Sequence, residues 1–119
     1  MSGNAAEAAF NNLVVGSTLS AITFVMDYVQ CDFDGTNLTA YTVLTVRAEG
    51  HTWLPTDSGW RDALCGRIGV VVRRVVRSDE QLCIDFEDNS EIAVSLRDSD
   101  YVGPEAFMLS SNNRPIVVG

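Results

Sequence analysis

The chain has one histidine, His51, so any Ser-His-acid or Cys-His mechanism must use it. His51 lies in a Gly-His-Thr-Trp segment that is typical of a loop, and no G-x-S-x-G elbow occurs in the sequence. We therefore expect a solvated loop histidine rather than a catalytic base. The sequence predicts that the protein is not an enzyme.

The three cysteines are Cys31, Cys65 and Cys83, and no two of them form a C-x-x-C pair. An odd number of scattered cysteines argues against a disulfide framework and favours a reducing cytosol. Three separated thiols and one histidine match no zinc-ligand spacing. We expect the cysteines to pack as small hydrophobic residues, and we predict no metal and no cofactor.

Two polar turns carry several oxygen ligands that a hard cation could use. Their side chains are Asp32, Asp34 and Asn37 in one turn, and Asp85, Glu87 and Asp88 in the other. The EF-hand loop and its final glutamate are missing, and turn conformation alone explains Asp and Asn at such positions. We interpret both segments as turns rather than as metal sites.

All eight basic residues are arginines, so a Schiff-base lysine and a phosphate-loop lysine are both excluded. Four of them form the one basic cluster: Arg67, Arg73, Arg74 and Arg77. This cluster could bind a phosphate or a carboxylate. Cross-strand pairing with acids, above all Asp85 and Glu87, is the favoured interpretation.

The net charge of −8 disfavours nucleic acid as a partner and favours a basic protein surface. No apolar run reaches the roughly 20 residues that a membrane-spanning helix needs. The first residues also lack the basic segment of a secretory signal. We predict a cytoplasmic protein.

Aromatic residues gather in two connecting segments. Trp53 and Trp60 flank Pro55 and Gly59, and Tyr101 lies just before Gly103-Pro104. Two tryptophans in a connection could form a partner-binding hot spot. They could equally cover one open end of the core, which is the more common role of large side chains in a small domain.

The chain also contains a weak copy of itself. Residues 28–38 and 81–92 are both an apolar alternation ending in Asp-Phe-acid, followed by a polar turn and a second alternating run. Phe33 precedes Phe86 by 53 positions, and Leu13–Gly16 precedes Ala63–Gly66 by 50. Such an offset indicates duplicated supersecondary units. We predict one domain over 1–119, with repeats at about 4–48 and 57–97 and a C-terminal extension at 98–119.

Each repeat is predicted to be a helix followed by three strands. In the first, a capping box at Asn4 and Glu7 begins a helix, and strands follow at 18–26, 29–33 and 38–46. In the second, Asp57 or Ser58 caps a helix through Cys65.

Its strands are predicted at 70–77, 82–86 and 92–96. Where Arg73 and Arg74 adjoin, either one of them faces inward or the strand carries a bulge. Residues 49–56 are expected to be a loop. Short strands at 106–109 and 115–118, joined by a turn at Asn112-Asn113, follow. The fold class is α+β and mostly β: an antiparallel sandwich or a partly open barrel.

The stretch Asp100-Tyr101-Val102-Gly103-Pro104-Glu105-Ala106, following a strand that ends in Asp-Phe-acid, resembles small uncharacterised bacterial proteins. The resemblance covers about the second half of the chain. It implies a bacterial source, and it carries over no activity and no functional residue.

Two functions remain. The first is a non-enzymatic interaction module that associates with itself or binds a basic partner, in the manner of an immunity protein against a basic toxin. A homodimer is expected if the poorly charged segments 38–46 and 116–118 are sheet edges. The second is a small-ligand-binding barrel with an aromatic and arginine-lined pocket. The candidate binding residues for either are Trp53, Trp60, Tyr101, Arg73 and Arg74.

Overall fold

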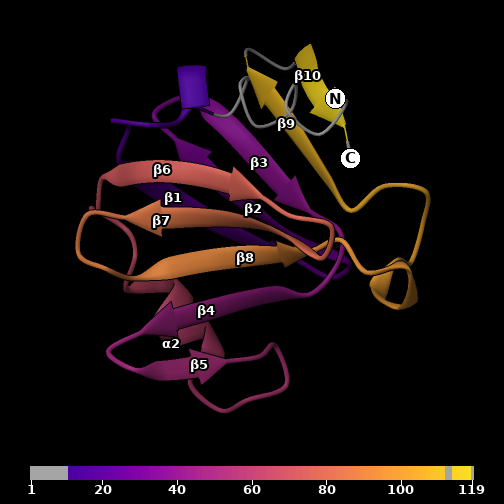
Figure 1. Cartoon of the computed structure of the whole chain (residues 1–119), viewed down its shortest axis with the longest axis horizontal. Helices are drawn as coiled ribbons and strands as arrows, with labels where there is room; N and C mark the ends of the chain where they lie inside the picture. Colours follow the sequence, from indigo (N-terminus) through magenta and orange to yellow (C-terminus); the bar gives the residue numbers. More distant parts are fainter. Residues whose placement is uncertain (1–10, 112–113, 119) are drawn as a thin grey trace.

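The computed structural model describes residues 11–111 and 114–118, and it consists of two five-stranded antiparallel sheets packed face to face (Figure 1). The first sheet has the order β1 (Leu19–Val25), β2 (Tyr28–Phe33), β3 (Thr36–Ala40), β9 (Phe107–Ser111), β10 (Arg114–Val118). The second has the order β5 (His51–Trp53), β4 (Leu44–Ala48), β8 (Glu91–Ser95), β7 (Gln81–Phe86), β6 (Val72–Arg77). The mostly-β fold class is confirmed, and within the described ranges the sheets do not close into a barrel.

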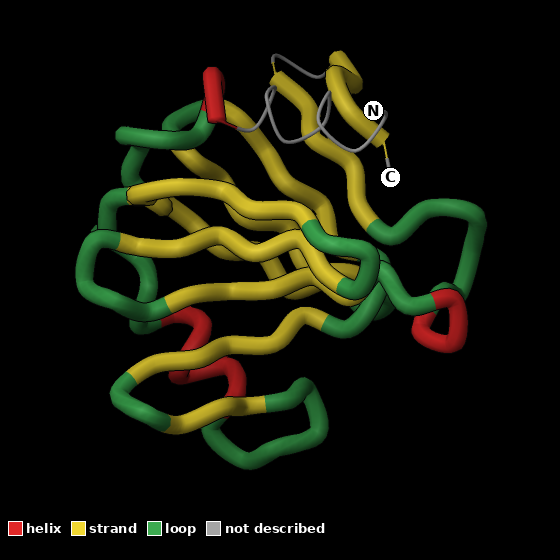
Figure 2. The backbone as a smooth tube through the Cα atoms, in the orientation of Figure 1, coloured by secondary structure: helices red, strands yellow, loops and turns green. Residues whose placement is uncertain are grey.

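Helical structure is sparse, as Figure 2 shows. It comprises α2 (Trp60–Cys65), the 3-10 turn η1 (Asp98–Asp100) and a short stretch at residues 11–13. The capping box at Asn4 and Glu7 and the turn at Asn112-Asn113 lie outside the described residues. No helix in the described part of the chain is long and apolar enough to cross a membrane.

The core forms because alternating apolar residues of both sheets point into the space between them. Val29, Cys31 and Phe33 of β2 are buried, and so are Leu82, Ile84 and Phe86 of β7. The hairpin between β2 and β3 turns at Asp34 and Gly35, whose φ angles of 54° and 100° suit a two-residue loop. The strands predicted at 29–33 and 82–86 are confirmed.

The expected strand at 38–46 is wrong, because the chain changes sheets within it. β3 ends at Ala40 in the first sheet, and β4 begins at Leu44 in the second. The connection is held where the Tyr41 amide donates to the Ala106 carbonyl and the Thr42 hydroxyl donates to the Ser95 carbonyl. Neither strand is an edge, because β3 lies between β2 and β9, and β4 lies between β5 and β8.

Two smaller expectations are also corrected. The loop expected at 49–56 contains β5, which pairs with β4 after a turn at Glu49-Gly50, where both φ angles are positive. α2 is not capped by Asp57 or Ser58: its N-cap is Gly59, with a φ of 89° and no side-chain capping bond. The Asp57 carboxylate instead accepts a hydrogen bond from the Leu54 amide at 2.8 Å.

Two backbone hydrogen bonds join the sheets at four positions, of which Gly16 and Gly69, and likewise Leu19 and Val72, are 53 residues apart. The Gly16 amide donates to the Val72 carbonyl at 2.9 Å, and the Gly69 amide donates to the Leu19 carbonyl at 2.8 Å. β1 and β6 each carry an irregularity just after this contact, between Leu19 and Ala21 in one and between Val72 and Arg74 in the other. Of the two alternatives predicted beside Arg73 and Arg74, the strand irregularity is present and both side chains are exposed.

Each sheet also contains strands from both parts of the chain. The meander β1–β2–β3 is extended by β9 and β10, and the meander β6–β7–β8 is extended by β4 and β5. Hairpins are therefore exchanged between the sheets. The segment expected as a C-terminal extension supplies two strands of the first sheet.

Trp60 attaches α2 to the second sheet, and the effect of removing this contact can be measured. Its indole N–H donates to the Leu44 carbonyl at 2.8 Å, and the residue is buried. Trp60→Phe removes the donor and some ring volume, so we expect the free energy of unfolding to fall by about 2 kcal/mol in urea denaturation. Trp53→Phe is the control, with an expected loss below about 1 kcal/mol because Trp53 is only half-buried. Equal losses would contradict this role of Trp60.

Candidate functional site

The five residues predicted to bind a partner or ligand do not gather at one place. Trp53 lies on β5 and Arg73 and Arg74 lie on β6, the opposite edges of the second sheet. Trp60 is buried beneath β4, and Tyr101 follows η1, packed against the core. A single aromatic pocket anchored by Arg73 or Arg74 is therefore not formed.

Two of the four arginines in the cluster, Arg67 and Arg74, pair with acids among the described residues, and of the two acids expected as partners only Asp85 takes part in these pairs. Arg74 Nε lies 2.6 Å from Asp85 Oδ2, and Arg67 Nη1 lies 3.0 Å from Asp88 Oδ2. Arg73 donates to the Asn89 side-chain oxygen at 3.2 Å. These contacts link β6 to β7 and to the β7–β8 turn, and link the segment after α2 to that turn.

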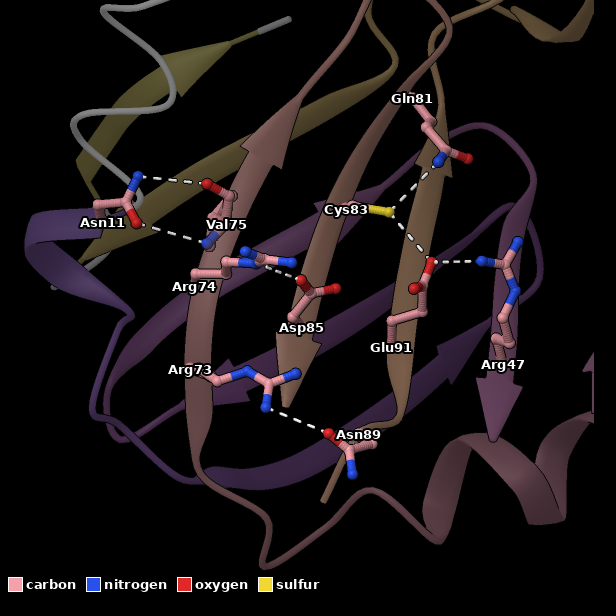
Figure 3. Close-up of polar contacts among 10 residues, drawn as sticks. All are labelled: Asn11, Arg47, Arg73, Arg74, Val75, Gln81, Cys83, Asp85, Asn89 and Glu91. Atoms are coloured by element: carbon pink, nitrogen blue, oxygen red, sulfur yellow. Dashed lines mark hydrogen bonds and ion pairs between the residues drawn. The ribbon is translucent and has the colours of Figure 1, made fainter. Parts of the chain in front are cut away.

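The outer face of the second sheet carries a row of charges across four strands (Figure 3). The strand registers place Arg74 opposite Asp85, Asp85 opposite Glu91, and Glu91 opposite Arg47. Arg47 Nη1 lies 3.2 Å from Glu91 Oε2. Because the two carboxylates are neighbours, an arginine at each end of the row offsets their mutual repulsion.

Cys83 lies beside this row and donates its thiol proton to Glu91 at 3.2 Å, while Gln81 donates to its sulfur. Burial, followed by the hydrogen bond to Glu91, raises the pKa of Cys83 to about 12. The Cys83 sulfur and one carboxylate oxygen each from Asp85 and Glu91, which could all serve as metal ligands, lie within 4.8 Å of one another. A metal would have to displace the thiol proton and two guanidinium partners, so we interpret the group as a cross-strand network.

A different surface has the properties of a binding site, and the sequence did not indicate it. Met26 is 96% exposed at the tip of the β1–β2 turn, and Val102 is 90% exposed in the loop between η1 and β9. That loop stands away from the sandwich in Figure 1. Contiguous apolar surface, rather than a single exposed residue, marks an interaction site, and each of these two side chains lines a hollow.

Two adjoining hollows share Asp27 in this region. The first, of about 250 Å³, is lined by Asp27, Tyr41 and the loop residues 102–105. The second, of about 240 Å³, lies between the β1–β2 turn and the start of α2, and Met26 and Trp60 line it. We call the surface formed by Met26, Asp27, Tyr41, Val102 and Glu105 the Met26 corner.

The Met26 corner combines an apolar hollow with negative charge. Tyr41, Val102 and Pro104 supply the apolar wall, and Asp27 and Glu105 are the charged residues that line the same hollow. Tyr28 packs edge-on against Tyr41, with ring centroids 5.8 Å apart, which holds the tyrosine wall in place. Such a surface can accept an apolar side chain and a neighbouring cation.

Comparisons with known proteins give no relatives: no family model, no curated protein and no solved structure matches the chain.

The surroundings of the cysteines predict their reactivity. Burial raises the pKa of Cys31 to about 12, the pKa of Cys83 is raised to about 12, and Cys65 is exposed. We expect iodoacetamide at about pH 8 to alkylate Cys65 first, and the other two only on unfolding. Mass spectrometry of timed samples measures this order. Alkylation of Cys83 as fast as Cys65 would contradict it.

The same shifts give the pH dependence of stability. Because the folded pKa lies above the unfolded value, the unfolded chain loses its thiol protons first as the pH rises. Stability should therefore fall between the ordinary thiol pKa of 9.0 and about 12. The free energy of unfolding, measured by denaturation at a series of pH values, should fall less over this range in Cys83→Ser than in the original protein.

Proposed function

We propose that this protein is a non-enzymatic interaction module that binds a basic segment of a protein partner at the Met26 corner. The observation that carries the proposal is the position of Met26 and Val102, two nearly fully exposed apolar residues, beside hollows that share Asp27. Burying one such side chain against a partner contributes about 1.5–3 kcal/mol. That is the range expected of an interface hot spot.

Charge supports a basic partner. Asp27 and Glu105 line the first hollow, and the whole chain carries a net charge of −8. A field of this sign accelerates encounter with a positively charged surface and disfavours an acidic one. The occupant that fits best is therefore an apolar side chain flanked by arginine or lysine.

The sheet edges support a separate partner rather than a second copy joined by strand pairing. The Asn11 side chain bonds both the amide and the carbonyl of Val75 on β6 (Figure 3). The start of β1 is bonded to Gly69 and Val70, β5 has three residues, and β10 contains Pro115 and a register shift. Covered, short, bulged and proline-containing edges resist pairing with another chain.

The test is an amide chemical-shift titration by NMR with two short peptides, acetyl-Arg-Leu-Arg-amide and acetyl-Glu-Leu-Glu-amide. We expect saturable shifts around Tyr41 and Val102 with the basic peptide, at the millimolar affinity of a small fragment. Val102→Asn should weaken this binding about fivefold, because it removes one apolar contact of about 1 kcal/mol.

Asp27→Asn tests the charge, and Val76→Asn is the matched control. Val76 is 43% exposed on β6, outside the Met26 corner. Asp27→Asn should weaken binding of the basic peptide only, and Val76→Asn should leave the binding of both peptides unchanged. Equal binding of the acidic peptide, or shifts confined to another surface, would overturn the proposal.

We also propose that the two parts of the chain descend from one duplicated unit, namely a helix, three strands and an exchanged hairpin. The paired contacts Gly16–Val72 and Gly69–Leu19, each with a bulge following in the same place, support this origin. In this pairing Gly69, and not Gly66, corresponds to Gly16.

A further inference from the structure

The outer face of the second sheet has a hollow of about 270 Å³ whose floor is built from three neighbouring strands. Ala93 of β8 pairs with Thr45 of β4 on one side and with Cys83 of β7 on the other. Ala93 faces outward yet is only 7% exposed, because longer side chains surround its methyl group. Strand positions are rigid, so this hollow is preorganised.

Opposite charges line the two ends of the hollow. Arg47 lies at one end, and its guanidinium keeps further N–H donors beside the one that contacts Glu91. At the other end Asp100 accepts a hydrogen bond from the Ser95 hydroxyl at 2.5 Å. Arg97 and Glu80 also line this end, paired with each other at 3.1 Å.

The strand register sets the separation between the two ends. Arg47 is opposite Glu91, and Asp100 is fastened to Ser95, four residues further along β8. Four residues of strand span about 13 Å between backbones. A compact anion would reach the charges at one end only, whereas an elongated molecule with one charge at each end matches both.

We propose that this hollow binds a small linear zwitterion of the ω-amino-acid kind. Its carboxylate contacts the Arg47 guanidinium, its methylene chain lies over Ala93 against Leu54, and its ammonium group contacts the Asp100 carboxylate. The exposed Arg47–Glu91 pair contributes little stability by itself, so Arg47 can turn to a ligand carboxylate. This goes beyond the proposed function, because it uses another face and another class of ligand.

The duplication proposed above relates this hollow to the first hollow of the Met26 corner. Asp27 and Tyr41 line the first hollow of the Met26 corner. Glu80 lies 53 residues after Asp27, Ser95 lies 54 residues after Tyr41, and both line the hollow above Ala93. Corresponding places on the two sheets therefore hold hollows of opposite character. One is apolar and acidic, and the other is polar with charges of both signs.

The test is an NMR titration of the full chain with 5-aminopentanoate, pentanoate and pentylamine. The zwitterion should give saturable shifts at Thr45, Ala93 and Ser95 with a dissociation constant below about 20 mM. Each singly charged compound should bind at least about fivefold more weakly, since it lacks one of two ionic contacts. Equal binding of pentanoate, or no saturable shift with the zwitterion, would overturn the proposal.

Two variants and a control sharpen this test. Ala93→Leu fills the floor and should abolish the shifts, with a well-dispersed spectrum showing that the fold persists. If that variant fails to fold, Arg47→Gln should remove the advantage of the zwitterion over pentylamine. Arg73→Gln is the control, because Arg73 is an exposed arginine of the same sheet that contacts Asn89 outside the hollow. Retained binding in Arg47→Gln would refute the assignment.

Discussion

The structure depends on the exchange of hairpins between the two sheets. β4 leaves the meander that precedes it and pairs with β8, and β9 pairs with β3 in return. Phe33, Phe86 and Phe107, which come from different parts of the chain, are all fully buried in one core cluster. Neither meander can therefore complete its sheet, or bury its apolar face, without strands from the other.

The exchange also determines where the candidate sites lie. The β3–β4 connection and the loop before β9 both have to cross between the sheets, and their residues Tyr41 and Val102 line the hollow of the Met26 corner. On the second sheet, β4 is brought beside β8, so Arg47 and Thr45 border the hollow above Ala93. Both surfaces are consequences of the same two crossings.

Much of the fold could be predicted from the sequence, because strands with one buried face repeat every two residues. The irregularity beside Arg73 and Arg74 was predictable as one of two alternatives, since adjacent arginines break the alternation unless one faces inward or an extra residue is inserted. The crossing after Ala40 was not predictable in this way. Leu38, Ala40, Leu44 and Val46 stay in phase and are all buried, so the alternation runs on while the backbone changes sheets.

The candidate site was harder to predict than the fold. Tryptophan is favoured at interfaces, but Trp60 is buried, and its indole N–H donates a hydrogen bond to the Leu44 carbonyl. Met26 and Val102 are single apolar residues in a turn and a loop, and a single residue has no periodicity to detect. Their exposure depends on the β1–β2 turn and on the loop before β9, which only the tertiary structure places together.

The most direct test of the hairpin exchange is to divide the chain between Thr56 and Asp57, both exposed, and to measure the mass and circular dichroism of each fragment alone and mixed. The exchange predicts that neither fragment folds as a monomer and that the mixture recovers the native spectrum as a one-to-one complex. A control division between Thr45 and Val46, inside a central strand, should not recover it. A folded monomeric fragment would contradict the exchange, because one part of the chain would then complete its own sheet.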